Sequence, residues 1–136
     1  FNNWIPQENF YYAAKNYNFE VNPLGRSEGT YNKYASLDDA TDPLHYYMAY
    51  IKFGIGRTTS DAAHEIRDGH ITREEGIQLV RKFDHEIPSN SMQITLDYLN
   101  ISREDLEQIT DAFRDRNKNL WKKTNQGWDL KHAVHK

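Results

Sequence analysis

The sequence predicts a mainly α-helical fold of about five helices, with a small β-hairpin at the C-terminal end. Apolar residues recur at three- and four-residue steps through much of the chain, which is the spacing of one helix face. Two such stretches begin with a hydroxyl residue and an acidic residue three positions later, Thr72 with Glu75 and Ser102 with Asp105. This pairing is typical of a capped helix start.

The composition indicates a folded chain of single-domain size. The chain has 136 residues, of which 38% are hydrophobic and 13% aromatic, whereas disordered chains are poor in large rings. The net charge is −3 and the basic residues are scattered, so we expect no nucleic-acid partner. There is no Cys, which excludes disulfides, thiolate zinc sites and cysteine nucleophiles.

The sequence also argues against a membrane protein. No apolar run approaches the ~20 residues that a membrane-spanning helix needs, and the start of the chain has no signal-peptide pattern. We therefore expect no membrane partner and a cytoplasmic location. The chain begins with Phe1 rather than Met, so we interpret it as a fragment of a longer protein.

Three regions follow one another along the chain. Residues 1–35 are rich in Tyr and Asn and predict one short helix over 7–16, where Pro6 fits the first turn, and then irregular chain over 21–34. Residues 36–116 form the predicted helical domain. Residues 117–136 form a tail in which 120–123 and 128–131 predict the two strands of a small hairpin.

Within the helical domain, the pattern predicts helices over 43–53, 60–68, 72–86, 91–99 and 102–115. Ser36 with Asp39 resembles a further capping box, and Asp42 is the predicted N-cap of the helix that follows, with Pro43 at its first position. The helix over 43–53 is apolar on nearly every face, so we expect it to be central and buried.

The segment around Gly54 and Gly56 is the first candidate for a binding site. Glycines let backbone N–H groups turn toward a ligand, and the helix start that follows adds the positive end of a dipole. Arg57 adds a planar fork that suits a carboxylate or phosphate. The segment is neither a Rossmann fingerprint nor a Walker loop. The alternative is an ordinary helix stop followed by a helix start.

A second candidate is the polar segment 26–31, which carries one carboxylate, Glu28. Functional groups often lie on such loops, although a solvated connection is the alternative. The six His residues have no metal-ligand spacing, so we predict no metal site, and no residue is identified as catalytic.

Several blocks of the sequence together resemble the C-terminal half of the N-acetyl sugar amidotransferases. The block at 28–39 reads EGTYNKYASLDD, that at 50–63 reads YIKFGIGRTTSDAA, and the segments 45–47 and 66–75 also match. The stretches 4–6 and 80–84 fit the same pattern, and the similarity spans most of residues 1–115 without the tail. These proteins act in bacterial lipopolysaccharide, surface-polysaccharide and flagellin-glycan pathways.

The resemblance implies a two-part enzyme of which this chain is one part. In that family an N-terminal ATP-pyrophosphatase domain with a Ser-Gly-Gly-x-Asp-Ser loop uses ATP and Mg to adenylate the sugar substrate. Ammonia from a partner glutaminase subunit then displaces AMP, which converts an acetamido group into an acetamidino group. This sequence has no such loop. We therefore expect no α/β ATP-pyrophosphatase domain, no cofactor and no activity in this chain alone.

The resemblance further implies that the chain contributes to a site for an acetamido sugar or nucleotide sugar. The implied substrate-binding residues are Glu28, Gly29, Thr30, Tyr31, Gly56, Arg57 and Thr58. Glu28 is expected to hold a sugar hydroxyl or orient ammonia, and Tyr31 to stack on a sugar face. We expect a homodimer, because removing a catalytic half uncovers apolar surface. The alternative function is a non-catalytic helical module that docks another subunit.

Overall fold

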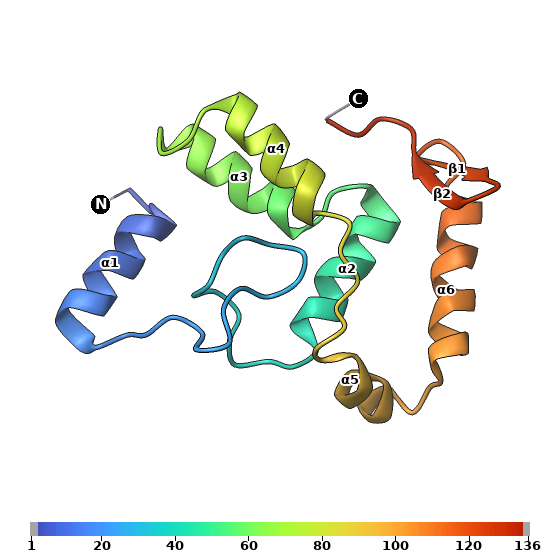
Figure 1. The fold of residues 1–136 in the computed structure, drawn as a ribbon, viewed down its shortest axis with the longest axis horizontal. Coiled ribbons are helices and arrows are strands. Elements are labelled where there is room, and N and C mark those ends of the chain that lie inside the picture. Colours follow the sequence, from blue (N-terminus) through green and yellow to red (C-terminus); the bar gives the residue numbers. More distant parts are fainter. Residues whose placement is uncertain (1–2, 135–136) are drawn as a thin grey trace.

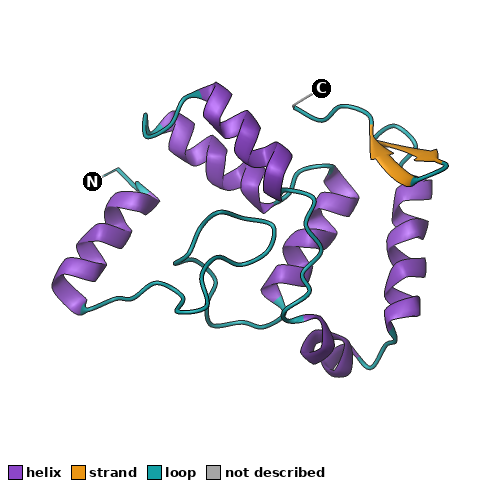
Figure 2. Cartoon of the chain, viewed as in Figure 1, coloured by secondary structure: helices purple, strands orange, loops and turns teal. Residues whose placement is uncertain are grey.

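The computed structural model describes residues 3–134, and within this range the chain forms six α-helices and one antiparallel hairpin (Figures 1 and 2). This confirms the mainly α-helical fold with a small terminal hairpin. The helices are α1 Pro6–Tyr17, α2 Asp42–Phe53, α3 Arg57–Arg67, α4 Arg73–Phe83, α5 Met92–Leu99 and α6 Arg103–Arg116, and the strands are β1 Trp121–Thr124 and β2 Gly127–Leu130. None of the helices in this range is long and apolar enough to cross a membrane.

The main hydrophobic core forms around one face of α2. Its buried members are Leu44, Tyr47 and Ile51 of α2, Met92 and Leu96 of α5, and Leu106 of α6. Ile51 is completely buried, so the predicted central position of this helix is confirmed. Helix α2 is not buried on every face, however, because Phe53 at its end is 61% exposed.

Helices α3 and α4 pack against each other as a second helical pair (Figure 1). The two helices approach closely at Gly76, where an added Cβ would lie 2.7 Å from Cδ1 of Ile66. Ala62 faces the same position, and Val80 and Phe83 are buried further along α4. A side chain at position 76 would therefore push the two helices apart.

The C-terminal hairpin docks on the end of α2. Trp121 is buried, donates from its indole Nε1 to the carbonyl oxygen of Ile51 at 2.8 Å, and meets the ring of Tyr50 edge to face at 5.4 Å. Trp121 pairs with Leu130 across the hairpin, and Leu130 is also buried. The predicted hairpin is confirmed, with strand bounds that differ by one residue at each end.

Some of the predicted helix caps are confirmed and others are wrong. Both capping boxes, Thr72 with Glu75 and Ser102 with Asp105, are present with reciprocal hydrogen bonds. The predicted capping box of Ser36 with Asp39 is wrong, because no helix begins there. Asp39 instead accepts from the backbone N–H of Thr41 at 2.7 Å, which stabilises a local turn. The N-cap of α2 is Thr41 rather than the predicted Asp42, which is instead the first residue of the helix.

Helix α1 stands apart from the other helices (Figure 1) and has no buried residue. The ring of Phe10 in α1 stacks on Tyr34 with centroids 4.3 Å apart. The Tyr34 hydroxyl donates to Oε1 of Gln7, also in α1, at 3.0 Å. One aromatic residue of the loop therefore holds α1 through both an apolar and a polar contact.

We predict that Phe83→Ala lowers the free energy of unfolding by about 3–5 kcal/mol, because this ring is buried and the guanidinium of Arg26 lies 4.3 Å from its centroid. Phe113 is only half-buried, so Phe113→Ala is expected to cost about 1–2 kcal/mol. Chemical denaturation of the two variants measures the difference. Equal losses would contradict the assignment of the two packing environments.

Candidate functional site

The two predicted binding segments meet in the tertiary structure. Thr58, in the first turn of α3, is completely buried and donates from both its backbone N–H and its hydroxyl to the carbonyl oxygen of Gly29, at 3.0 and 2.6 Å. Thr30 is also completely buried, and its hydroxyl donates to Asp61 of α3. The loop at 28–31 is therefore attached to the start of α3.

The N-terminus of α3 is capped by the side chain of Asp84, which follows α4. Its buried carboxylate accepts from the backbone N–H of Gly56 at 3.0 Å, and from the N–H and hydroxyl of Thr59 at 2.9 and 2.7 Å. Because this carboxylate takes the place of an external anion, it neutralises the positive end of the helix. Gly56 is required for space here, since an added Cβ would lie 2.6 Å from Oδ1 of Asp84.

Asp84 also explains two differences in helix bounds. Helix α3 begins at Arg57, three residues before the predicted start at position 60, because the carboxylate satisfies N–H groups of its first turn. Helix α4 ends at Phe83, three residues before the predicted end at position 86, and the chain turns so that Asp84 faces α3.

Arg57 lies in the interior, with 4% of its surface exposed. Its Nη2 donates to the carbonyl oxygen of Ala35 at 2.8 Å, and its guanidinium lies 4.6 Å from the ring centroid of Tyr46. The other terminal nitrogen, Nη1, is buried and makes no hydrogen bond to the residues that the structure describes. Arg57 and Glu28 both border a cavity of about 10 Å³. Their direct contact with a substrate stays a prediction.

Glu28 connects the loop to the segment after α4. Its Oε1 accepts from the hydroxyl of Ser89 at 2.9 Å and from the backbone N–H of Asn90 at 3.0 Å. Partial burial acts to raise the pKa of Glu28, but these hydrogen bonds outweigh it and hold the pKa below its usual value. The carboxylate is therefore ionised at neutral pH and stabilises the loop.

A second acidic residue, Glu86, stabilises the same loop. Glu86 forms a bidentate ion pair with Arg26, with distances of 2.7 and 2.8 Å, and also accepts from the backbone N–H of Gly29 at 3.0 Å. The conformation of segment 26–30 is thus fixed by contacts to one end of the α3–α4 pair, where α3 begins and α4 ends.

Two of the predicted site residues reach sizeable grooves: Glu28 lines one of about 390 Å³ with Ser36 and Asn90, and Tyr31 lines a larger one. The larger groove has a volume of about 560 Å³ and lies between α1, the loop at 31–34 and α3. Gln7 and Tyr11 of α1, Tyr31 and Asn32 of the loop, Glu65 of α3 and His70 are among its lining residues. We name it the α1–α3 groove.

Titratable groups with raised pKa values gather beside this groove. Burial raises the pKa of Asp61, although the Thr30 hydroxyl and the charge of Arg57 oppose it. Burial likewise raises the pKa of Glu65. Burial and these two carboxylates raise the pKa of Tyr31 well above its usual range. Perturbed groups that cluster beside a groove are typical of functional sites.

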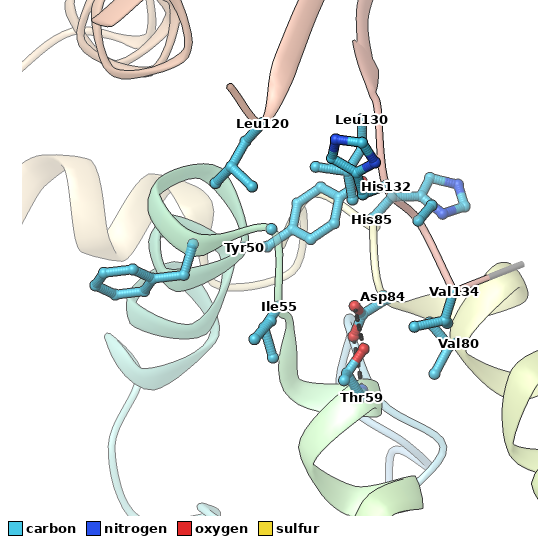
Figure 3. A pocket seen from close by; sticks show the side chains of 13 residues that line it. Tyr50, Ile55, Thr59, Val80, Asp84, His85, Leu120, Leu130, His132 and Val134 are labelled. Atoms are coloured by element: carbon cyan, nitrogen blue, oxygen red, sulfur yellow. Dashed lines mark hydrogen bonds between the residues drawn. The ribbon is translucent and has the colours of Figure 1, made fainter. Parts of the chain in front are cut away.

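A separate pocket of about 260 Å³ lies between the ends of α2 and α4 and the chain after β2 (Figure 3). Leu120, Leu130 and Val134 line it, and burial together with the Asp84 charge raises the pKa of Tyr50 there to about 12. Asp84 borders the pocket, but its carboxylate is engaged by α3 (Figure 3). This pocket suits an apolar group better than a sugar.

The described part of the chain contains no cluster of three or more His, Cys, Asp or Glu residues that could hold a metal ion. The sequence analysis did not identify Asp61, Glu65 or Asp84 as important. Asp61 and Glu65 are four residues apart and so share one helix face, which was a usable signal. Nothing near Asp84 in the sequence indicates its role.

Comparison with known protein families gives one match. A family model described as "LPS biosynthesis protein WbpG-like, C-terminal domain" matches residues 28–135. This range includes the C-terminal hairpin, which the resemblance in the sequence analysis left out. No curated protein matches the chain.

We predict that Asp84→Asn lowers the free energy of unfolding by about 2–4 kcal/mol, because an amide NH₂ would face one of the donors that the carboxylate now accepts from. Asp39→Asn serves as the control, since Asp39 is exposed and caps only a local turn; we expect a change within about 0.5 kcal/mol. Equal effects in chemical denaturation would show that the Asp84 cap is unimportant.

Because the pKa of Asp61 is raised, the stability of the folded protein should depend on pH. The folded protein holds this proton more tightly than the unfolded chain, so the resulting stabilisation is present below the usual pKa of 3.8 and is lost as pH rises through the folded pKa. Asp61→Asn keeps an oxygen acceptor for Thr30 and removes the buried charge. Its melting temperature should therefore exceed that of the wild type at pH 7 but not at pH 3.5.

Asp115→Asn, at an exposed position of α6, is the control for this measurement. It should change the melting temperature little at either pH. A lower melting temperature for Asp61→Asn at pH 7 would mean that the Asp61 charge stabilises the fold, contrary to its raised pKa.

Proposed function

From the premise that this chain belongs to the family of WbpG-like C-terminal domains of LPS biosynthesis proteins, we propose that it is the sugar-recognising part of an ATP-dependent N-acetyl sugar amidotransferase. The parent enzyme would convert an acetamido sugar into an acetamidino sugar for lipopolysaccharide or flagellin glycans. The chain's own contribution is to bind and orient the sugar.

The observation that carries this proposal is the contact between the two segments of strongest resemblance. Thr58 donates two hydrogen bonds to Gly29, so the blocks at 28–39 and 50–63 form one structural unit. Tyr31, in the first block, lines the α1–α3 groove together with Glu65. The resembling sequence therefore surrounds one candidate site and supports a shared role for its parts.

The residues of this chain do not fit ATP. The sequence contains no Ser-Gly-Gly-x-Asp-Ser loop, and the helix start that most resembled an anion site is filled by Asp84. Residues 3–134 contain no group of three or more His, Cys, Asp or Glu residues that could hold a metal ion. These facts support placing ATP and Mg²⁺ in another part of the parent protein.

The proposal includes two partners. A glutaminase subunit would supply ammonia to the parent enzyme, as the resemblance implies. A second copy of the chain would pack on the aromatic N-terminal segment, where Tyr17 and Phe19 are exposed. Contiguous exposed apolar surface on a soluble chain favours association.

A non-catalytic interaction module is the second candidate function. It is favoured by α1, which buries none of its residues and exposes several aromatic side chains. The two candidates differ in what they require, since an interaction module needs no sugar. Sugar-dependent turnover by the parent protein therefore distinguishes them.

We predict that the parent protein, supplied with ATP, Mg²⁺, ammonia and an acetamido sugar, releases pyrophosphate and AMP and replaces the acetamido oxygen with NH. Mass spectrometry of the sugar detects this replacement. The 136-residue chain alone should give no product and should not bind Mg-ATP in calorimetry, because it lacks a loop that cradles phosphate.

Mixing the chain with ATP but no sugar serves as the control for adventitious hydrolysis. Micromolar binding of Mg-ATP to the isolated chain would contradict the division of roles. A parent protein that binds its partners but leaves the sugar unchanged would favour the interaction module.

A further inference from the structure

The α1–α3 groove has an aromatic edge. Tyr11 of α1 lines it and is 60% exposed, so its ring is accessible to a ligand. Phe10 and Tyr34 stack with an angle of 8° between their planes, so a pair of packed rings lies beside Tyr11. An exposed ring next to an open groove provides the flat apolar surface on which the C–H face of a pyranose ring can pack.

The polar groups of the groove complement an acetamido group. Asn32 uses its Oδ1 to accept from the backbone N–H groups of Tyr34 and Ala35, at 2.8 and 3.2 Å, so its Nδ2 donors are not used by these bonds. Glu65 supplies acceptor oxygens. An acetamido group offers one acceptor, its carbonyl oxygen, and one donor, its N–H, so the groove holds a partner for each.

Tyr31 places a buried hydroxyl beside Glu65. Its hydroxyl is shielded from solvent and makes no hydrogen bond of normal geometry to the described residues, although Glu65 lies near enough to raise its pKa. Buried hydroxyls are nearly always hydrogen-bonded. The nearest partner of the Tyr31 hydroxyl is therefore Glu65, and Tyr31 helps to position that carboxylate at the groove.

The charge of the groove selects among sugar derivatives. Lys33 is the single Lys or Arg among its lining residues, and the carboxylate of Glu65 opposes it, with Asp61 close by. A diphosphate carries at least two negative charges and would meet these carboxylates. The groove therefore has no cluster of cations to pair with the phosphates of a nucleotide and suits a sugar ring better.

We propose that the α1–α3 groove binds the pyranose ring of an N-acetylhexosamine unit, with Tyr11 packed on the ring face and Glu65 and Asn32 hydrogen-bonded to its substituents. Val21 and Ile71, which also line the groove, supply apolar surface for the acetamido methyl group. This inference rests on the proposed function for its choice of an acetamido sugar. It assigns the site to residues outside the segment 56–58.

The test uses the 136-residue chain and the methyl glycoside of N-acetylglucosamine as probe, followed by protein-observed NMR titration. Tyr11→Ala should weaken binding roughly tenfold, because it removes the packing ring. Tyr12→Ala is the matched control. Tyr12 is 62% exposed, lies next to Tyr11 on the same helix and does not line the groove, so its removal should leave the affinity unchanged.

The methyl glycoside of glucose, which lacks the acetamido group, is the matched ligand control and should bind at least severalfold more weakly. Glu65→Gln should also weaken binding, and circular dichroism of each variant should show unchanged helix content. Three results would overturn the proposal: no shifts at groove residues in the wild type, equal losses for the two Tyr variants, or equal affinity for the two glycosides.

Measurements on the parent protein separate this inference from the proposed function. If the parent converts the sugar and Tyr11→Ala leaves KM unchanged, the groove is not the sugar site and the proposed function stands. If the groove binds the acetamido glycoside while the parent shows no amidotransferase activity, the groove assignment stands and the proposed function fails.

Discussion

The carboxylate of Asp84 is the contact on which the arrangement of α3, α4 and the loop before them depends. It accepts three hydrogen bonds from Gly56 and Thr59 at the start of α3, although it follows α4 in the chain. A buried carboxylate is costly unless its oxygens are paired, and a helix N-terminus supplies both N–H donors and a positive dipole. The carboxylate and the N–H groups of the helix N-terminus therefore satisfy each other's hydrogen-bonding capacity. This mutual pairing holds the ends of the α3–α4 pair together.

The loop at 26–31 is positioned by that same end of the helical pair. Thr58 donates to Gly29, Glu86 accepts from Gly29, and Glu28 accepts from Asn90. These contacts come from two segments, the start of α3 and the chain after α4, both of which are far from the loop in sequence. They fix the direction in which the chain leaves the loop, and so they place the next residues, from Tyr31 to Tyr34, at the α1–α3 groove. The segments that resemble the amidotransferases thus support the groove and also line part of it, through residues 31–34, His70 and Ile71.

The sequence predicted the helices best where local chemistry decides them. The capping boxes at Thr72 and Ser102 mark helix starts correctly, because each is completed by a side chain three residues away. The same pattern at Ser36 failed, since Asp39 bonds to the nearby Thr41 and makes a turn instead. The candidate site was harder to predict. Tyr31 was identified from the resemblance, but Tyr11 and Glu65 come to the groove from α1 and α3.

The sequence by itself determined the fold class, the approximate helices and the terminal hairpin, because periodicity, caps and turns act within a few residues. Only the tertiary structure decided that the α3 N-terminus pairs with Asp84 and that Arg57 packs under Tyr46 inside the protein. The reason is physical. A helix N-terminus attracts any carboxylate that reaches it, and the local sequence around Gly56 and Arg57 does not reveal that the protein supplies its own from 28 residues away.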